Sequence, residues 1–109
     1  MRVIEVDKES FDSVVLQSEI PVVVDLWGPK CGPCLALLPQ VEELAKEYEG
    51  RVAFCKLNVA ENRRLVISLK VMGVPTFLFY KAGEIASRIT GGEVTLESIR
   101  ENTEKLLQA

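Results

Sequence analysis

The chain has 109 residues, of which 48% are apolar and 27% are charged, and its formal net charge at pH 7 is −3. This length and composition predict one soluble globular domain, and the mixed charges leave no basic stripe for nucleic acid or for an acidic membrane. The sequence contains no histidine, which excludes histidine catalysis and every metal site that mixes cysteine with histidine.

The cellular compartment is predicted from the apolar segments and the cysteines. The longest apolar runs, such as residues 20–24, are far shorter than the roughly 20 residues that span a bilayer. The N-terminus carries Glu5 inside its apolar segment, which is not the pattern of a secretory signal. Three cysteines do not form a secreted disulfide framework. We therefore expect a cytoplasmic protein.

The first part of the chain predicts a strand, a helix and a second strand. Residues 2–6 alternate weakly and predict a short strand. Asp7 is a suitable N-cap for a helix that extends to about Ser18. The residues expected on the buried face of this helix are Phe11, Val14 and Val15. The valine-rich run at 22–27 is typical of a strand covered on both faces.

The next segment predicts a long amphipathic helix, which Gly50 ends. Its apolar residues recur every three or four positions, at 34, 37, 38, 41, 44, 45 and 48. Residues 52–58 then predict a second central strand, and residues 65–70 a short helix.

The last part of the chain predicts a hairpin and a helix. Residues 76–80 and 84–90 are expected to pair as strands across a turn at 82–83, followed by a loop at 91–92. Thr95 is expected to cap the final helix. Its inward residues would be Leu96, Ile99, Thr103, Leu106 and Leu107. This alternating order predicts an α/β fold in one domain, residues 1–109, with helices on both faces of a central mixed sheet of about five strands.

Cys31 and Cys34 lie where a strand and a loop lead into the long helix. At this spacing their side chains are near neighbours on one helical face, within reach of a disulfide. Cys34 is in register with the apolar stripe, so we expect it to be buried. Cys31 lies at the helix start, where free N–H groups and the helix dipole favour a thiolate. An exposed Cys31 would attack a disulfide, and a shielded Cys34 would resolve the mixed disulfide.

A Cys-x-x-Cys pair also has two less specific explanations. One is half of a structural zinc site, but such a site needs four ligands, and Cys55 and carboxylates are the remaining candidates. The other is a pair of inert core cysteines, which the strand–loop–helix context disfavours.

Several motifs at characteristic separations identify a family. They are Val24-Asp25-Leu26-Trp27, Cys31-Gly32-Pro33-Cys34, Pro39, Lys56-Leu57-Asn58, Gly73-Val74-Pro75-Thr76, Gly83 and Gly91. In this combination the chain resembles the thioredoxin family over essentially its whole length. The resemblance implies a dithiol site that reduces disulfides in client proteins and is reduced again by a thioredoxin reductase. It also implies a cis Val74–Pro75 bond against the active site.

The resemblance gives roles to two polar residues inside apolar strands. Asp25 interrupts the valine-rich run, and burial without a partner would raise its pKa. The resemblance implies that Asp25 assists proton transfer at Cys34 and that Lys56 lies nearby and tunes it. The alternatives are that Asp25 faces solvent at the end of its strand and that Lys56 extends outward from an edge strand.

The remaining site residues also follow from the resemblance. It implies a substrate-binding surface formed by Trp27, Gly32, Pro33, Val74, Pro75 and Gly91. Lys30 stands where relatives usually have a second tryptophan, and Ala60 where many have an aspartate that contacts the matching tryptophan. We expect Lys30 to affect which partners dock. Cys55 points away from Lys56 by strand alternation, and we interpret it as core filling.

Two further functions share this fold. A disulfide oxidant or isomerase usually has other residues between its cysteines, and a non-catalytic binding subunit would not need Cys31. We expect a monomeric reductase without a cofactor or metal, with no nucleic acid or membrane partner. The electron donor would be an NADPH-dependent flavoprotein reductase or a ferredoxin-linked one.

Overall fold

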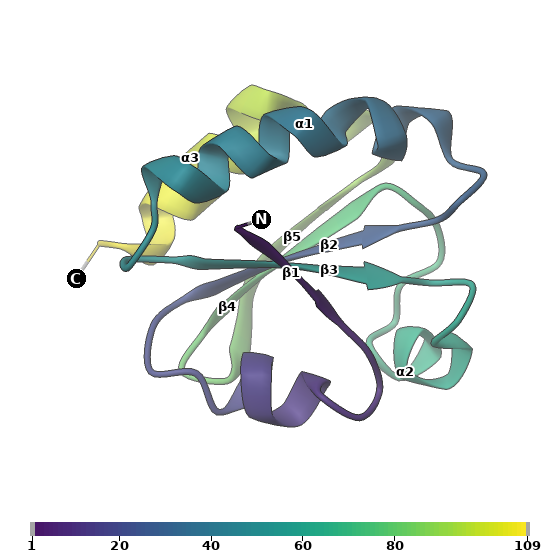
Figure 1. The fold of residues 1–109 in the computed structure, drawn as a ribbon, viewed down its shortest axis with the longest axis horizontal. Helices are drawn as coiled ribbons and strands as arrows, with labels where there is room; N and C mark the ends of the chain where they lie inside the picture. The colour runs from purple at the N-terminus through teal and green to yellow at the C-terminus, as the bar shows by residue number, and fades with distance from the viewer. Residues whose placement is uncertain (1, 109) are drawn as a thin grey trace.

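The computed structural model describes residues 2–108, at whose centre lies a five-stranded mixed sheet (Figure 1). Its strands are β1 (Val3–Val6), β2 (Val22–Trp27), β3 (Ala53–Asn58), β4 (Thr76–Lys81) and β5 (Glu84–Thr90). They lie side by side in the order β1-β3-β2-β4-β5. The first three in this order are parallel, whereas β4 runs antiparallel to β2 and β5 antiparallel to β4. Strand β2 is therefore the central strand.

Helices cover both faces of the sheet, as predicted (Figure 1). Helices α1 (Gly32–Glu47) and α3 (Leu96–Leu106) lie on one face, and a short π-helix η1 (Asp12–Leu16) and α2 (Arg63–Ser68) lie on the other. A 3-10 turn, η2 (Gly91–Glu93), follows β5. No helix within residues 2–108 is long and apolar enough to cross a membrane.

The two faces of β2 belong to two separate cores. Val23 contributes to the core under α1 and α3, whereas Val22, Val24 and Leu26 contribute to the core on the η1 side. All residues from Val22 to Leu26 are buried, which is the reason for the continuous apolar run in the sequence. A side chain at position 25 is consequently enclosed whatever its chemistry.

The apolar stripe of α1 lies as predicted. The buried residues of this stripe are Cys34, Val41, Leu44, Ala45 and Tyr48, and the two leucines at 37 and 38 are half-buried. Because Cys34 belongs to this stripe, the packing of α1 on the sheet determines which cysteine is shielded.

Four details differ from the sequence expectations. The segment after Asp7 forms a π-helix that ends at Leu16 rather than an α-helix to Ser18; the Asp7 carboxylate accepts the N–H groups of Glu9 and Ser10 in a turn that precedes it. Leu107 was expected to face inward, but it is 36% exposed. The helix ends at Leu106, so Leu107 is the C-cap and no longer continues the buried face of α3. The short helix α2 spans Arg63–Ser68 rather than the expected residues 65–70. Residues 91–92 start a 3-10 turn rather than a loop.

The hairpin turn between β4 and β5 supplies a stability prediction. Gly83 has φ +79°, and a Cβ there would lie 2.7 Å from the backbone oxygen of Leu16, whereas Gly50 has φ +85° with no atom within 4 Å of its Cβ position. Gly50→Ala should cost about 1–2 kcal/mol for the left-handed conformation alone. Gly83→Ala should cost about 2–4 kcal/mol, because η1 must also move. Urea unfolding of both variants measures the difference, and equal losses would show that the turn does not pack against η1.

Candidate active site

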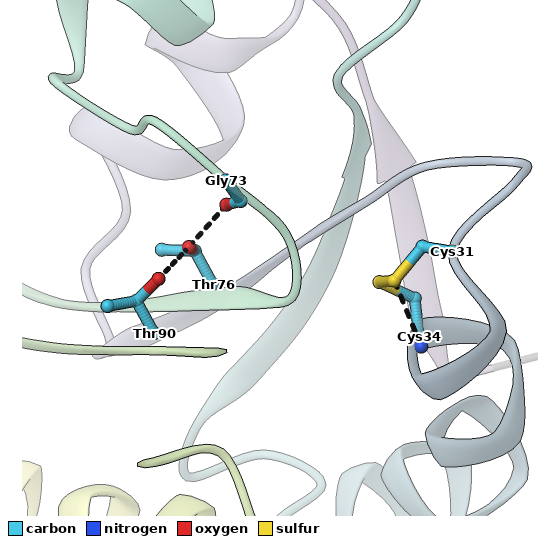
Figure 2. Close-up of a disulfide and its surroundings, with 5 residues drawn as sticks. All are labelled: Cys31, Cys34, Gly73, Thr76 and Thr90. Atoms are coloured by element: carbon cyan, nitrogen blue, oxygen red, sulfur yellow. Dashed lines mark hydrogen bonds between the residues drawn. A yellow bond between two sulfur atoms is a disulfide. The ribbon is translucent and has the colours of Figure 1, made fainter. Parts of the chain in front are cut away.

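Cys31 and Cys34 form a disulfide at the start of α1 (Figure 2). Their Cα atoms are 5.3 Å apart. Cys31 is the N-cap residue with an extended backbone, and its Sγ accepts the backbone N–H of Cys34 at 3.3 Å. The prediction that this pair lies within disulfide reach is confirmed, and the sulfur of Cys31 is held at the N-terminus of the helix.

The exposure of the two cysteines differs in the predicted direction. Cys34 is only 3% exposed, which confirms its predicted burial. Cys31 is half-buried rather than fully exposed, because its sulfur is turned back onto the first turn of α1. No acidic residue occupies that first turn, so the helix dipole acts on Cys31 without an opposing carboxylate.

Asp25 lies inside the protein, on the face of the sheet that α1 covers. It is 2% exposed, and within residues 2–108 its Oδ1 has no hydrogen-bond partner. Burial raises the pKa of Asp25 to about 7, although the charge of Lys56 acts in the opposite direction. The alternative of a solvent-facing Asp25 is therefore wrong. A carboxyl that titrates near neutral pH can both accept and return a proton.

Lys56 is the register partner of Asp25 on β3, the strand next to β2. Its side chain is 13% exposed, and its Nζ lies 3.7 Å from Oε1 of Glu5 and 5.6 Å from the ring centre of Trp27. Because β3 lies between β1 and β2, the alternative of an edge-strand lysine is also wrong.

Cys55 is a free, buried thiol in the core on the η1 side. Burial raises the pKa of this thiol to about 11, so at neutral pH it is protonated and a poor nucleophile. The interpretation of Cys55 as core filling agrees with this position.

An open hollow of about 620 Å³ adjoins the disulfide. Its lining residues are Gly28, Pro29, Lys30, Cys31, Gly32, Pro33, Ala60 and Val74. Four residues predicted to contact partners or substrates, those at positions 30, 32, 33 and 74, thus line the same hollow as Cys31. The predicted residues Trp27, Pro75 and Gly91 do not line this hollow.

The segment from Gly73 to Thr76 places Val74 at this hollow. The Val74–Pro75 bond is cis, as the resemblance implies. Figure 2 shows the hydroxyl of Thr76, which donates to the Gly73 oxygen at 2.7 Å and lies 2.8 Å from the hydroxyl of Thr90. The N–H of Gly91 donates to the oxygen of Pro75 at 2.9 Å. Gly91 therefore contributes by holding the segment through its backbone.

Trp27 is half-buried at the end of β2. In the part of the chain that the structure describes, its indole Nε1 is buried without a hydrogen-bond partner. Ala60 cannot accept a hydrogen bond through its side chain, so it offers this N–H no oxygen of the kind an aspartate would supply. Residues 2–108 also contain no group of three or more Cys, Asp or Glu side chains placed to hold a metal ion.

Comparison with known proteins decides the family. The family model described as Thioredoxin matches residues 2–105. The chain belongs to the thioredoxin family. It is 47% identical to a thioredoxin from Peptoclostridium acidaminophilum over 88% of this chain and 87% of that protein. It is 38% identical to a thioredoxin from Acetoanaerobium sticklandii over 94% of this chain and 98% of that protein.

Chloroplast relatives are longer. The chain is 41% identical to the M-type chloroplastic thioredoxin of Spinacia oleracea over 94% of its own length, but it spans only 56% of that protein.

Family membership and the Cys31–Cys34 disulfide together make the chain a thiol–disulfide oxidoreductase, a disulfide reductase of the thioredoxin type.

Sequence reasoning missed two features near the site. The Thr76–Thr90 pair joins strands whose register is a tertiary property, although both threonines stand at the ends of predicted hairpin strands. The contact between Glu5 and Lys56 joins β1 to β3. Its one sequence signal is an acidic residue inside a short apolar strand.

The raised pKa of Asp25 predicts a pH-dependent stability. The folded state binds the Asp25 proton more tightly than the unfolded state does, so the free energy of unfolding should fall as pH rises from about 4 to about 7, the range between the ordinary pKa of 3.8 and about 7. Each tenfold change in proton affinity corresponds to about 1.4 kcal/mol. Compared with Asp25→Asn, the wild type should therefore lose up to about 4 kcal/mol over this range.

Urea unfolding of both oxidised proteins at a series of pH values measures this difference. The two proteins share every other ionisable group, so their difference isolates Asp25. Parallel pH profiles would contradict the raised pKa.

Proposed function

We propose that the chain reduces disulfides in client proteins with Cys31 as nucleophile and Cys34 as resolving thiol, and that a thioredoxin reductase returns it to the dithiol state. The observation that carries this assignment is the unequal burial of two bonded cysteines at one helix start, since Cys31 is half-buried beside an open hollow and Cys34 is 3% exposed. A client sulfur can reach the first cysteine and not the second.

The reaction divides into two exchanges. The Cys31 thiolate attacks one sulfur of the client disulfide; the client S–S bond breaks, and the other client sulfur leaves as a thiolate that takes up a proton. Cys34 then loses its proton and attacks Cys31 in the mixed disulfide, which releases the second client thiolate and forms the Cys31–Cys34 bond. The dithiol loses two electrons and two protons, and the client gains both.

Asp25 is proposed as the acceptor of the Cys34 proton. Its carboxyl lies buried on the α1 face of the sheet, and with a pKa of about 7 it is roughly half ionised at neutral pH. The ionised half can accept a proton, and the protonated half can return one when the protein is reduced again. Lys56 would tune this carboxyl through its positive charge, which favours the ionised form.

The surface around Cys31 is proposed as the docking site for clients and for the reductase. Gly32, Pro33 and Val74 line the hollow. Pro75 follows Val74 and accepts the N–H of Gly91, and Trp27 is the last residue of β2. A second hollow of about 330 Å³ shares Val74. Its apolar rim includes Ile67, which is 69% exposed, and Met72, which is 100% exposed. Apolar side chains of a partner fit such a surface.

Lys30 is proposed as a specificity residue. Its side chain is exposed at the hollow that contains Cys31. A cation at this position favours acidic partner surfaces and makes association depend on salt. The donor reductase would be of the NADPH-dependent flavoprotein type or ferredoxin-linked.

The remaining proposals concern the cellular compartment, the oligomeric state and the partners that the protein would not bind. We place the protein in the cytoplasm, which its similarity to bacterial thioredoxins supports. It would act as a monomer with one domain over residues 1–109 and would bind neither nucleic acid nor membrane. The net charge of −3 supports the absence of nucleic acid binding.

Two cysteine variants test the division of roles. Cys31→Ser should abolish insulin reduction with dithiothreitol as electron source, because no accessible nucleophile remains. Cys34→Ser should retain the first exchange and accumulate a mixed disulfide with the client, which mass spectrometry of the trapped species detects. Cys55→Val, a core substitution of similar size, is the control and should leave activity intact. Trapping by Cys31→Ser rather than by Cys34→Ser would reverse the assignment.

A further inference from the structure

Three ionisable side chains stand in a row across three neighbouring strands. Glu5 on β1 and Asp25 on β2 are both register partners of Lys56 on β3. Register partners on parallel strands project from the same face of a sheet, and this is the face on which α1 lies. Across the sheet, the order is therefore the Glu5 carboxyl, the Lys56 ammonium and the Asp25 carboxyl. Asp25 lies on the face covered by α1, the helix that carries Cys34.

The ammonium of Lys56 is not shared equally between the two carboxyls. Its Nζ lies 3.7 Å from Oε1 of Glu5, whereas no ion pair within 4.0 Å joins Lys56 to Asp25 in the described part of the chain. Lys56 is thus within ion-pair distance of Glu5, whereas the buried Asp25 has no ion pair with it and feels its charge from farther away.

We propose that Glu5 is a positioning residue of the redox site, which holds the Lys56 ammonium toward β1 and so leaves the Asp25 carboxyl without a paired cation. The effect on turnover rests on the proton-transfer role proposed above for Asp25, but the electrostatic arrangement does not. The pKa of Asp25 agrees with this arrangement, since burial raises it, Lys56 lowers it and Glu5 raises it again.

The other described elements packed around Asp25 contribute no further charged group that acts on its carboxyl besides Lys56 and Glu5. On β4 its register partner is the apolar Phe77. On α1, Cys34 is buried in the first turn, and the half-buried acid of that helix, Glu42, accepts the backbone N–H of Arg2 at 3.1 Å. Among residues 2–108, the charged groups that act on the pKa of Asp25 are Lys56 and Glu5.

Removal of the Glu5 charge should therefore release Lys56 toward Asp25. In Glu5→Gln the proton affinity of Asp25 should fall about threefold or more, which moves its titration midpoint down by about half a pH unit or more. Glu5→Asp keeps the carboxylate and should retain a midpoint closer to the wild type. Lys56→Gln should move the midpoint upward.

The test is a carboxyl ¹³C NMR titration of Asp25 in the oxidised full chain. The matched control is Glu43→Gln, which removes an exposed carboxylate that pairs with Lys46 at 3.2 Å on α1 and should leave the Asp25 midpoint unchanged. The Glu5→Gln substitution is repeated in the Lys56→Gln background. If Glu5 acts by positioning Lys56, its effect should be much smaller there.

Two results would overturn the proposal. One is an Asp25 midpoint in Glu5→Gln that equals that of the wild type and of Glu43→Gln. The other is an undiminished effect of Glu5→Gln in the Lys56→Gln background, which would mean that Glu5 acts by direct repulsion alone. The titration needs no client and no turnover. Failure of the proposed reductase function would appear instead in the cysteine variants, so the two failures are distinguishable.

Discussion

Strand β2 is buried on both faces, and this burial constrains the whole site. It is the central strand of the sheet, with β3 on one side and β4 on the other, and every residue from Val22 to Leu26 is enclosed. Four of these positions hold apolar side chains that join the two cores. The fifth holds Asp25, whose carboxyl is desolvated and has a raised pKa because the strand cannot expose it. Burial of the Asp25 carboxyl lowers the stability of the folded state at neutral pH. The same burial gives the carboxyl a pKa near 7, which suits the proposed proton transfer.

The end of the same strand determines the properties of the two cysteines. The chain leaves β2 at Trp27 and enters α1 at Gly32, so Cys31 becomes the N-cap and Cys34 enters the apolar stripe of the helix. One sulfur is held at the positive end of the helix dipole beside an open hollow, and the other faces the interior. The segment 73–76 forms another part of this hollow, and the Thr76–Thr90 contact ties it to β5. The proposed division into an attacking and a resolving thiol thus rests on how one helix packs on one strand.

Features that depend on local pattern could be predicted from the sequence, and features that depend on strand order could not. The burial of Cys34 followed from the periodicity of α1. The burial of Asp25 was favoured by the family resemblance, because its valine neighbours alone left a solvent-facing position open. The contact of Glu5 with Lys56 could not be predicted, because β1 pairs with β3 and not with the next strand in the sequence. The π-helical form of η1 was missed because a propensity pattern does not distinguish it from an α-helix. The exposure of Leu107 was missed because helix ends are set by the C-cap.

The proposed transfer of a proton from Cys34 to Asp25 is tested most directly by the single-turnover resolution of a mixed disulfide. A small aromatic thiol is placed on Cys31, and its release by Cys34 is followed by absorbance across a pH series. In the wild type, the rate of release should rise with a midpoint near the pKa of Asp25, about 7. In Asp25→Asn, release at neutral pH should be slower and should rise only toward the higher pH at which Cys34 ionises unaided. Identical profiles for the two proteins would contradict a role for Asp25 in the reaction.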